Sequence, residues 1–114
     1  MTRPDVNLLQ GTLDLLVLKA LEPGPQHGYG VARWVRETTD GAIEVEDGAL
    51  YTSLHRMERR GWVRPAWGLS ENNRKAKYYA LSAAGRRQLT AQTDAWSRYV
   101  AAMGKALRPA DGRT

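Results

Sequence analysis

The sequence predicts a mainly α-helical domain with one small antiparallel β-hairpin and a long C-terminal helix. Apolar residues recur at helical spacing in several segments, which indicates amphipathic helices. Two short runs that contain Trp, Tyr and Val flank a gap rich in Gly, Ser and Asn, which is typical of a hairpin. The chain has 114 residues, so it forms one domain, or one domain with an appended helix.

We divide the chain into a domain over residues 1–81, a helix over residues 82–107 and a tail over residues 108–114. A chain without cysteine has no disulfides and no thiolate metal ligands. The N-terminus lacks the layout of a signal peptide, and the apolar run from Leu13 to Leu21 is shorter than the roughly 20 residues that span a bilayer. We therefore expect a cytoplasmic protein that does not engage a membrane.

The first helix is expected over residues 7–21, because Asn7 and Gln10 have the spacing of a capping box. Its apolar residues cover most of the circumference: Leu8, Leu9, Leu13, Leu15, Leu16, Val17, Leu18 and Leu21. A helix that is apolar nearly all round is buried on more than one side. In so short a chain, we expect one of those sides to contact a partner subunit.

A second helix is expected over residues 27–38. Its candidate inward positions are Val31, Trp34 and Val35. His27 begins this helix, and we assign it a capping or packing role. Asp40 and Gly41 mark the turn that ends the helix, and Ile43 and Val45 then suggest a short extended segment.

The third helix is expected to begin at Glu46 or Asp47, with Asp47 as a good N-cap, and to end at Gly61 in a left-handed conformation. Its buried face follows the i, i+4, i+7 rule and consists of Leu50, Leu54 and Met57. At about 100° per residue, the opposite face is open to solvent. That open face consists of Gly48, Thr52, His55, Arg56 and Arg59, with Tyr51 on its flank.

Residues 62–67 and 75–81 are the two predicted strands of the hairpin. Two strands alone are only marginally stable, so the hairpin must pack on the helices. Tyr78 and Tyr79 point to opposite faces of one strand. One of them is therefore buried and the other is open, and the sequence does not settle which.

The last helix has Ser82 as its candidate N-cap and runs to about Leu107. Its apolar residues recur at spacings of 7, 4, 3 and 4, which is typical of a coiled-coil seam. The candidate dimer or effector surface consists of Leu9, Leu13, Leu16, Leu89, Trp96, Val100 and Met103. Trp96 would either form the core of a dimer or stack with its copy around a planar aromatic molecule.

No set of residues in the chain predicts catalysis. The chain has two His and no Cys, and His27 and His55 lack the spacing of a metal-binding pair. The glycine-rich segments match neither a dinucleotide-binding fingerprint nor a P-loop. We therefore expect no enzymatic activity, no cofactor and no metal site.

The positive charge is concentrated between Arg56 and Arg87. Of 17 Lys and Arg, nine lie there and two Glu oppose them, which gives this segment a net charge of +7 in a chain of net charge +5. Such a concentration is expected of a surface that binds a polyanion. A basic helix directly before a hairpin can place the helix in the major groove of DNA and the hairpin, or wing, beside it. The alternative is an amphipathic surface helix whose arginines are merely solvated.

The candidate DNA-binding residues of the third helix are Gly48, Ala49, Tyr51, Thr52, His55, Arg56 and Arg59. Those of the hairpin are Asn73, Arg74, Lys75, Lys77 and Tyr78, for which an ordinary solvated turn is the alternative. Ala49 and Thr52 could contact a thymine methyl group. His55 and Arg56 could hydrogen-bond to purine edges, with guanine as the partner of Arg56. Arg59 lies further along the helix, where contact with phosphate is favoured.

Four sequence blocks occur in a distinctive order. They are L-L-Q-G-T-L-D-L-L-V-L at 8–18, H-G-Y-G-V at 27–31, D-G-A-L-Y-T-S-L-H-R-M-E-R-R-G-W-V at 47–63 and W-G-L-S-E-N-N-R-K-A-K-Y-Y-A-L-S-A-A-G at 67–85. With these blocks the chain resembles a PadR-type transcriptional regulator of the short class, over residues 8–107. The resemblance implies a winged helix-turn-helix dimer that represses transcription from a pseudo-palindromic operator. It also implies that the first and last helices exchange across the dimer.

The resemblance assigns roles to positions of the third helix and the hairpin. Tyr51 and Lys77 would grip phosphate, while the helix around Ala49, Thr52 and Arg56 would read bases. Asp47 departs from the family pattern, in which Glu is common at this position. Ala49 stands where Thr or Ser is common, which removes one hydroxyl from the contact with base or phosphate.

Trp96-Ser97-Arg98 resembles the W-S-R sequence of drug-responsive members of the family, in which paired tryptophans line a pore for flat aromatic compounds. The sequence therefore predicts a homodimeric repressor that binds double-stranded DNA and that a planar aromatic effector releases. One alternative is a winged-helix module that binds protein and has no specific DNA site. A third interpretation is a dimer whose main role is to sense a small molecule.

Overall fold

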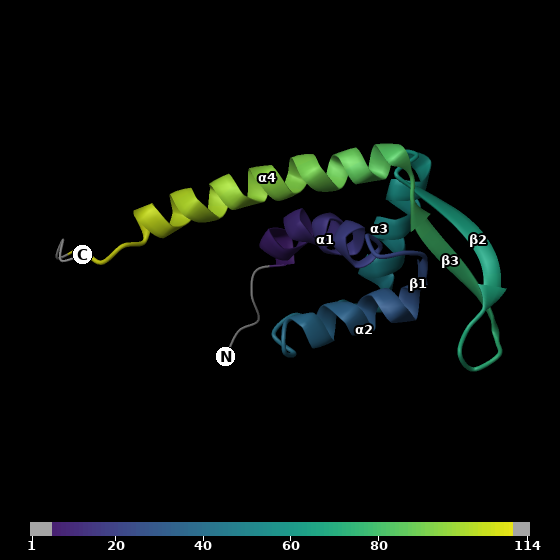
Figure 1. The fold of residues 1–114 in the computed structure, drawn as a ribbon. Helices are drawn as coiled ribbons and strands as arrows, with labels where there is room; N and C mark the ends of the chain where they lie inside the picture. Colours follow the sequence, from purple (N-terminus) through teal and green to yellow (C-terminus); the bar gives the residue numbers. More distant parts are fainter. Residues whose placement is uncertain (1–5, 111–114) are drawn as a thin grey trace.

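The computed structural model describes residues 6–110, with side chains from residue 12 onward. Its elements in chain order are α1 (Val6–Ala20), β1 (Gln26–His27), α2 (Gly28–Thr38), α3 (Asp47–Arg59), β2 (Val63–Leu69), β3 (Lys75–Leu81) and α4 (Ala83–Ala106). The helices α1, α2 and α3 lie together beside the sheet, and α4 extends away from this body (Figure 1). The predicted fold, mainly α with a small antiparallel sheet, a winged helix-turn-helix and a long C-terminal helix, is confirmed. Within the described residues, no helix is long and apolar enough to cross a membrane.

The sheet has three antiparallel strands in the order β1-β3-β2. The hairpin pairs β2 with β3 from Val63↔Leu81 to Leu69↔Lys75, and β1 adds Gln26↔Tyr79 and His27↔Tyr78 at the other edge. The prediction for residues 75–81 is confirmed, whereas the preceding strand runs to Leu69 and not only to Trp67. The sequence did not predict β1, because two residues carry no alternating pattern. Ile43 and Val45 form no strand; Val45 packs against the core from an irregular segment.

The core lies between the three short helices and one face of the hairpin. The buried residues of its main cluster are Val17, Leu18, Ala20, Leu21, Val31, Leu50, Leu54, Met57, Val63, Tyr79 and Leu89. The three predicted inward residues of α3 are therefore confirmed, and Trp34 packs partly buried against the same cluster. Tyr79, which is 1% exposed, is the buried member of the tyrosine pair. The hairpin thus rests on the helical core, as its marginal intrinsic stability requires.

The two ends of α3 are capped in different ways. Glu46 is the N-cap by backbone conformation and makes no capping hydrogen bond through its side chain, so the expectation that Asp47 caps the helix was wrong. Asp47 lies one residue later, in the first turn, where its negative charge interacts favourably with the helix dipole. At the other end Gly61 has φ +77°, as predicted. The N–H of Trp62 donates to the carbonyl of Met57 at 2.9 Å, which completes a Schellman motif.

The other two well-defined helix starts use side-chain caps. His27 caps α2, because its Nδ1 accepts from the N–H of Gly30 at 3.0 Å. Ser82 caps α4, because its Oγ accepts from the N–H of Gly85 at 3.0 Å, as predicted. The Asn7 and Gln10 capping box falls on side chains outside the described residues.

Helix α4 carries an apolar seam that its own subunit does not cover. Trp96, Val100, Met103 and Leu107 are 39%, 47%, 38% and 73% exposed, and Tyr99 is 46% exposed beside them. On α1, Val17 and Leu18 are buried, while Leu13, Leu15 and Leu16 keep part of their surface in solvent. The side chain of Leu9 lies outside the described residues. The two helices expected to meet a partner therefore both leave apolar surface open in the single subunit.

Candidate nucleic-acid interface

The outer face of α3 is open along its length. Gly48, Ala49, Tyr51, Thr52, His55 and Arg59 are all exposed, whereas Leu50, Leu54 and Met57 on the opposite face are buried. The helical periodicity thus predicted the correct division into a packed and an open face. The open face presents two small residues, a hydroxyl and an imidazole near its N-terminal half, which is the half of a recognition helix that reaches base edges.

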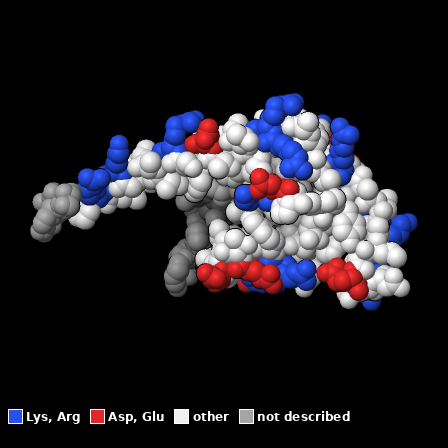
Figure 2. All heavy atoms as spheres, viewed as in Figure 1, with Lys and Arg blue, Asp and Glu red and all other residues white. Residues whose placement is uncertain are grey.

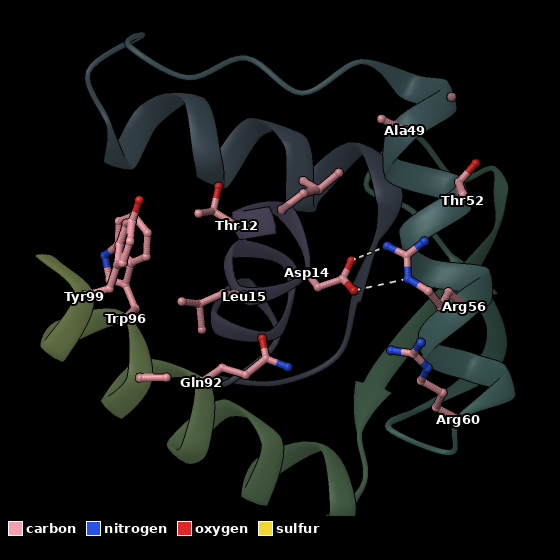
Figure 3. A pocket seen from close by; sticks show the side chains of 13 residues that line it. Thr12, Asp14, Leu15, Ala49, Thr52, Arg56, Arg60, Gln92, Trp96 and Tyr99 are labelled. Atoms are coloured by element: carbon pink, nitrogen blue, oxygen red, sulfur yellow. Dashed lines mark hydrogen bonds and ion pairs between the residues drawn. The ribbon is translucent and has the colours of Figure 1, made fainter. Parts of the chain in front are cut away.

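Arg56 is the exception on this face, because a partner from another helix holds it. Its Nε and Nη2 donate to the two carboxylate oxygens of Asp14 on α1, at 3.2 and 2.6 Å (Figure 3). The hydroxyl of Ser53, which is buried, donates to Asp14 Oδ1 at 2.5 Å. The hydrogen bond to Asp14 raises the pKa of Arg56 above its ordinary value, with burial acting in the opposite direction. The sequence placed Arg56 on the open face without a partner in the chain; the structure pairs it with Asp14 through two hydrogen bonds.

Asp14 is a residue that the sequence reasoning missed. It is the one carboxylate in the leucine-rich segment of α1, and its side chain is only 17% exposed. A charge on an apolar helix is costly unless it is paired. That cost was the signal for a partner, although nothing in the sequence identified the partner as a residue 42 positions away.

Tyr51 is positioned by close packing against the start of α2. A Cβ atom added to Gly28 would lie 2.6 Å from the hydroxyl oxygen of Tyr51 and 2.8 Å from Cζ. A side chain at this position would therefore displace the phenol ring from its present place against the first turn of α2. Tyr51 is 42% exposed, so it lies partly open at the edge of the outer α3 face.

A groove of about 700 Å³ runs between α3, the start of α2 and the hairpin. It is lined by His27, Gly28, Tyr29, Arg33, Tyr51, His55, Trp67, Ser70, Glu71, Asn72, Lys75, Ala76, Lys77 and Tyr79. The lining therefore contains three cations, Arg33, Lys75 and Lys77, and one carboxylate, Glu71. Elsewhere on the surface, Lys and Arg lie along α4 and over the base of the hairpin, while the lower edge carries two groups of Asp and Glu with Lys or Arg between them (Figure 2).

The predicted wing residues differ in their exposure and in their contacts within the chain. Asn73 has φ +61° in the turn, and Arg74 and Lys75 are exposed nearby. Lys77 is half-buried, and its Nζ lies 3.5 Å from Glu58 Oε1 on α3. Tyr78 donates its hydroxyl proton to the carbonyl of Leu69 at 2.7 Å. The hydroxyl of Tyr78 thus binds the backbone of its own hairpin.

Trp67 on β2 was not among the predicted site residues. Its side chain is 66% exposed in the groove, and the Nζ of Lys75 lies 5.1 Å from the ring centroid. Strand alternation puts Trp67 on the same hairpin face as its cross-strand partner Lys77. An exposed tryptophan beside two lysines offers an apolar and a cationic contact together, and the alternation of residues 63–69 was the signal that could have identified it.

A second hollow, of about 950 Å³, lies between α1, α3 and α4. Trp96 and Tyr99 form one wall, with ring centroids 5.6 Å apart, and the Asp14–Arg56 pair forms the opposite wall (Figure 3). Leu13 from the predicted dimer or effector surface also lines it, whereas Val100 and Met103 do not. Leu89 is buried in the core, so its assignment to that surface was wrong. Within the described part of the chain, no group of three or more His, Asp or Glu side chains could hold a metal ion.

The comparisons with known proteins agree with this geometry. A transcriptional regulator from Clostridium thermocellum has the same fold, with a TM-score of 0.83 at 21% identity over 93% of this chain and 100% of its own. A PadR family transcription regulator from Clostridium difficile matches at 27% identity and a TM-score of 0.74, over 85% of this chain and 99% of its own. One from Eggerthella lenta matches at 29% identity and a TM-score of 0.71, over 90% and 88%. The sequence profile described as "Transcriptional regulator PadR-like family" matches residues 17–91. The chain therefore belongs to the PadR-like family of transcriptional regulators, which regulate transcription and are not enzymes.

Proposed function

We propose that this regulator acts as a homodimer that represses transcription by binding a pseudo-palindromic operator. The observation that carries the proposal is that the open face of α3 and the cationic face of the wing flank the same groove. A recognition helix and a wing in this relation can contact base edges and the adjacent phosphates at once.

The residues divide into a reading set and a gripping set. Gly48, Ala49, Thr52 and His55 face outward on α3 and form the reading set with Arg56. Small side chains and a methyl-bearing hydroxyl suit contact with thymine, while imidazole and guanidinium suit purine edges. Tyr51, Arg59, Asn73, Arg74, Lys75 and Lys77 form the gripping set, because their hydroxyl, amide and cationic groups suit phosphate oxygens.

The proposed partner that buries the apolar seam of α4 is a second copy of the chain. Leaving Trp96, Val100, Met103 and Leu107 in water has a cost that association removes. In such a dimer the two recognition helices would enter successive major grooves about 34 Å apart. The operator would then consist of two inverted half-sites on one face of the DNA.

Binding to DNA from the chain's own promoter region is expected to exceed binding to a random duplex, and to fall steeply with salt. For about 6–10 phosphate contacts, affinity should fall by about 10³–10⁵ between 50 and 200 mM salt, because neutralised phosphates release counterions. A fluorescence-anisotropy titration over a salt series measures both effects, and sedimentation measures the mass of the bound species. A probe that keeps one half-site serves as the control for dimeric binding.

Equal affinity for promoter and random DNA would contradict the specific-regulator proposal. Weak binding with little salt dependence would instead favour a module that binds protein. Lys77→Ala is the control for gripping, because it should weaken all sequences alike.

We also propose that a planar aromatic effector binds near Trp96. The supporting observation is the hollow in which the Trp96 and Tyr99 rings lie 5.6 Å apart, with Trp96 39% exposed. A flat apolar ring can stack on such a surface.

Planar aromatic compounds are therefore expected to quench tryptophan fluorescence of the protein in a saturable manner. Because the chain has 4 Trp, the matched control is Trp96→Phe, which keeps an aromatic ring and should lose most of the quenching. Quenching that survives in Trp96→Phe, or an absence of quenching across a broad panel, would contradict an effector site at Trp96. The DNA-binding measurement above is independent of this outcome.

A further inference from the structure

The turn of the wing is tied to the start of α2 by one carboxylate. Glu71 lies between β2 and β3, and its Oε1 accepts from His27 Nε2 at 3.1 Å, across 44 residues of chain. Its Oε2 accepts from Arg33 Nη2 on α2 at 3.4 Å. The turn itself is closed by two backbone hydrogen bonds of 2.8 Å, from Ser70 to Arg74 and from Asn73 to Ser70. Figure 1 shows the hairpin descending beside β1 and the start of α2.

The tautomer of His27 is fixed by its second contact. Its Nδ1 accepts from the backbone N–H of Gly30, so Nδ1 carries no proton. The proton therefore resides on Nε2, which donates it to Glu71. His27 is only 7% exposed, and its ring lies 5.1 Å from that of Tyr78, its partner in the β1–β3 pairing. One buried imidazole thus caps α2 and anchors the wing at the same time.

Glu71 is ionised throughout the pH range in which DNA binding is measured. Its own backbone N–H and then the His27 side chain lower the pKa of this carboxyl to about 2. A fixed negative charge consequently lies in a groove whose other charged groups are Arg33, Lys75 and Lys77. By charge alone, this carboxylate would oppose the approach of DNA.

We propose that Glu71 is a positioning residue for DNA binding: its contacts with His27 and Arg33 hold the wing at a fixed distance from α3. The inference rests on the proposed DNA-binding function. A two-stranded ribbon is only marginally stable on its own, and β1 pairs with β3 only at Tyr78 and Tyr79, midway along that strand. Lys77 also lies 3.5 Å from Glu58 on α3. The contact of Glu71 adds a support at the turn, so that the turn and Lys75 need not be ordered when DNA binds.

Charge and position predict opposite results for Glu71→Ala. If Glu71 positions the wing, operator binding should weaken about 5- to 10-fold, because the cost of ordering the wing is then met on binding. The slope of log affinity against log salt should also become shallower by about 1 for each phosphate that the wing no longer touches. If charge alone matters, affinity should rise and the slope should not become shallower, which would overturn the proposal.

Three variants separate positioning from other effects. Glu37→Ala removes an exposed carboxylate from the end of α2 and controls for net charge. Glu71→Gln keeps an acceptor oxygen for His27 and should retain most of the affinity. His27→Asn keeps a good N-cap but removes the Nε2 donor, so it should weaken binding by up to as much as Glu71→Ala, which also removes the contact with Arg33. The double variant His27→Asn/Glu71→Ala should bind no more weakly than Glu71→Ala alone, since the hydrogen bond between the two residues is already lost in the single variant.

A measurement without DNA distinguishes this inference from the proposed function. Trypsin cuts after Arg74, Lys75 and Lys77, so release of the wing in Glu71→Ala should accelerate cleavage there several-fold at a temperature where the fold is intact. An unchanged cleavage rate would overturn the role of Glu71 whether or not the wild-type protein binds its promoter. If Glu71→Ala is cleaved faster but the wild-type protein shows no preference for promoter DNA, the role of Glu71 in anchoring the wing would stand, and the proposed operator binding would be refuted.

Discussion

Arg56→Ala is expected to weaken operator binding by about 1–3 kcal/mol and to relax the preference at one base position. The guanidinium lies on the α3 face proposed to enter the major groove, and Asp14 holds its Nε and Nη2 in a fixed plane. That arrangement leaves other N–H groups of the guanidinium for a base and removes the need to order a long side chain on binding. Affinities for a set of operators that each carry one base change measure both the weakening and its position.

Asp14→Asn is the matched change on the other side of the pair. It keeps every cation of the protein but removes the charge that orients Arg56, which is 32% exposed. Affinity for the operator should fall toward that for random DNA, while affinity for random DNA should stay the same or rise. If both variants instead bound the operator with unchanged base preference and only unfolded more easily, the Asp14–Arg56 pair would be purely structural.

The pair also links the two surfaces of the proposed regulator. Asp14 lies on α1, and the hollow between α1, α3 and α4 has Trp96 in one wall and the Asp14–Arg56 pair in the other. An aromatic compound in this hollow would therefore lie close to the contact that orients a base-reading side chain. This arrangement provides a physical route by which an effector could change DNA affinity, in addition to any change in the spacing of the two subunits.

The features predicted correctly from the sequence are those set by neighbours in the chain. The buried face of α3 follows from the spacing of Leu50, Leu54 and Met57, and the end of α3 follows from Gly61, which adopts positive φ. The second strand of the hairpin was predicted to the residue, because its ends are marked by turn residues and by Ser82. Family membership was also readable from local blocks in the correct order.

The features that escaped prediction depend on residues far apart in the chain. Asp14 meets Arg56 across 42 residues, and His27 meets Glu71 across 44. The alternation of a strand separates Tyr78 from Tyr79, but only the position of the core decides which one is buried. In each case the sequence shows which side chains are charged, polar or aromatic. Their partners and their burial, however, are determined by how the helices pack against the sheet.

Gly85→Ala is expected to destabilise the fold by about 1–3 kcal/mol, although alanine favours a helix by about 1 kcal/mol over glycine. A Cβ at Gly85 would overlap the backbone carbonyl oxygen of Trp62. That carbonyl accepts from the N–H of Ser82 at 3.0 Å, and Ser82 Oγ donates to the carbonyl of Gly61 at 2.6 Å. Because backbone on both sides is held, neither side can move aside as a flexible side chain would, and the steric cost exceeds the gain in helix propensity.

Denaturant unfolding of Gly85→Ala beside Gly104→Ala separates these two effects. Gly104 lies in the same helix, and an added Cβ there would meet no atom within 4 Å apart from the neighbouring backbone of the helix itself, so its substitution should stabilise the subunit by up to about 1 kcal/mol. Wild-type stability in Gly85→Ala would show that the start of α4 can shift on the hairpin. Such a shift would matter for function, because α4 joins the wing to the proposed dimer seam. A rigid junction at Gly85 would fix the distance between the two recognition helices of the dimer. A loose junction would let the dimer bind half-sites at more than one spacing.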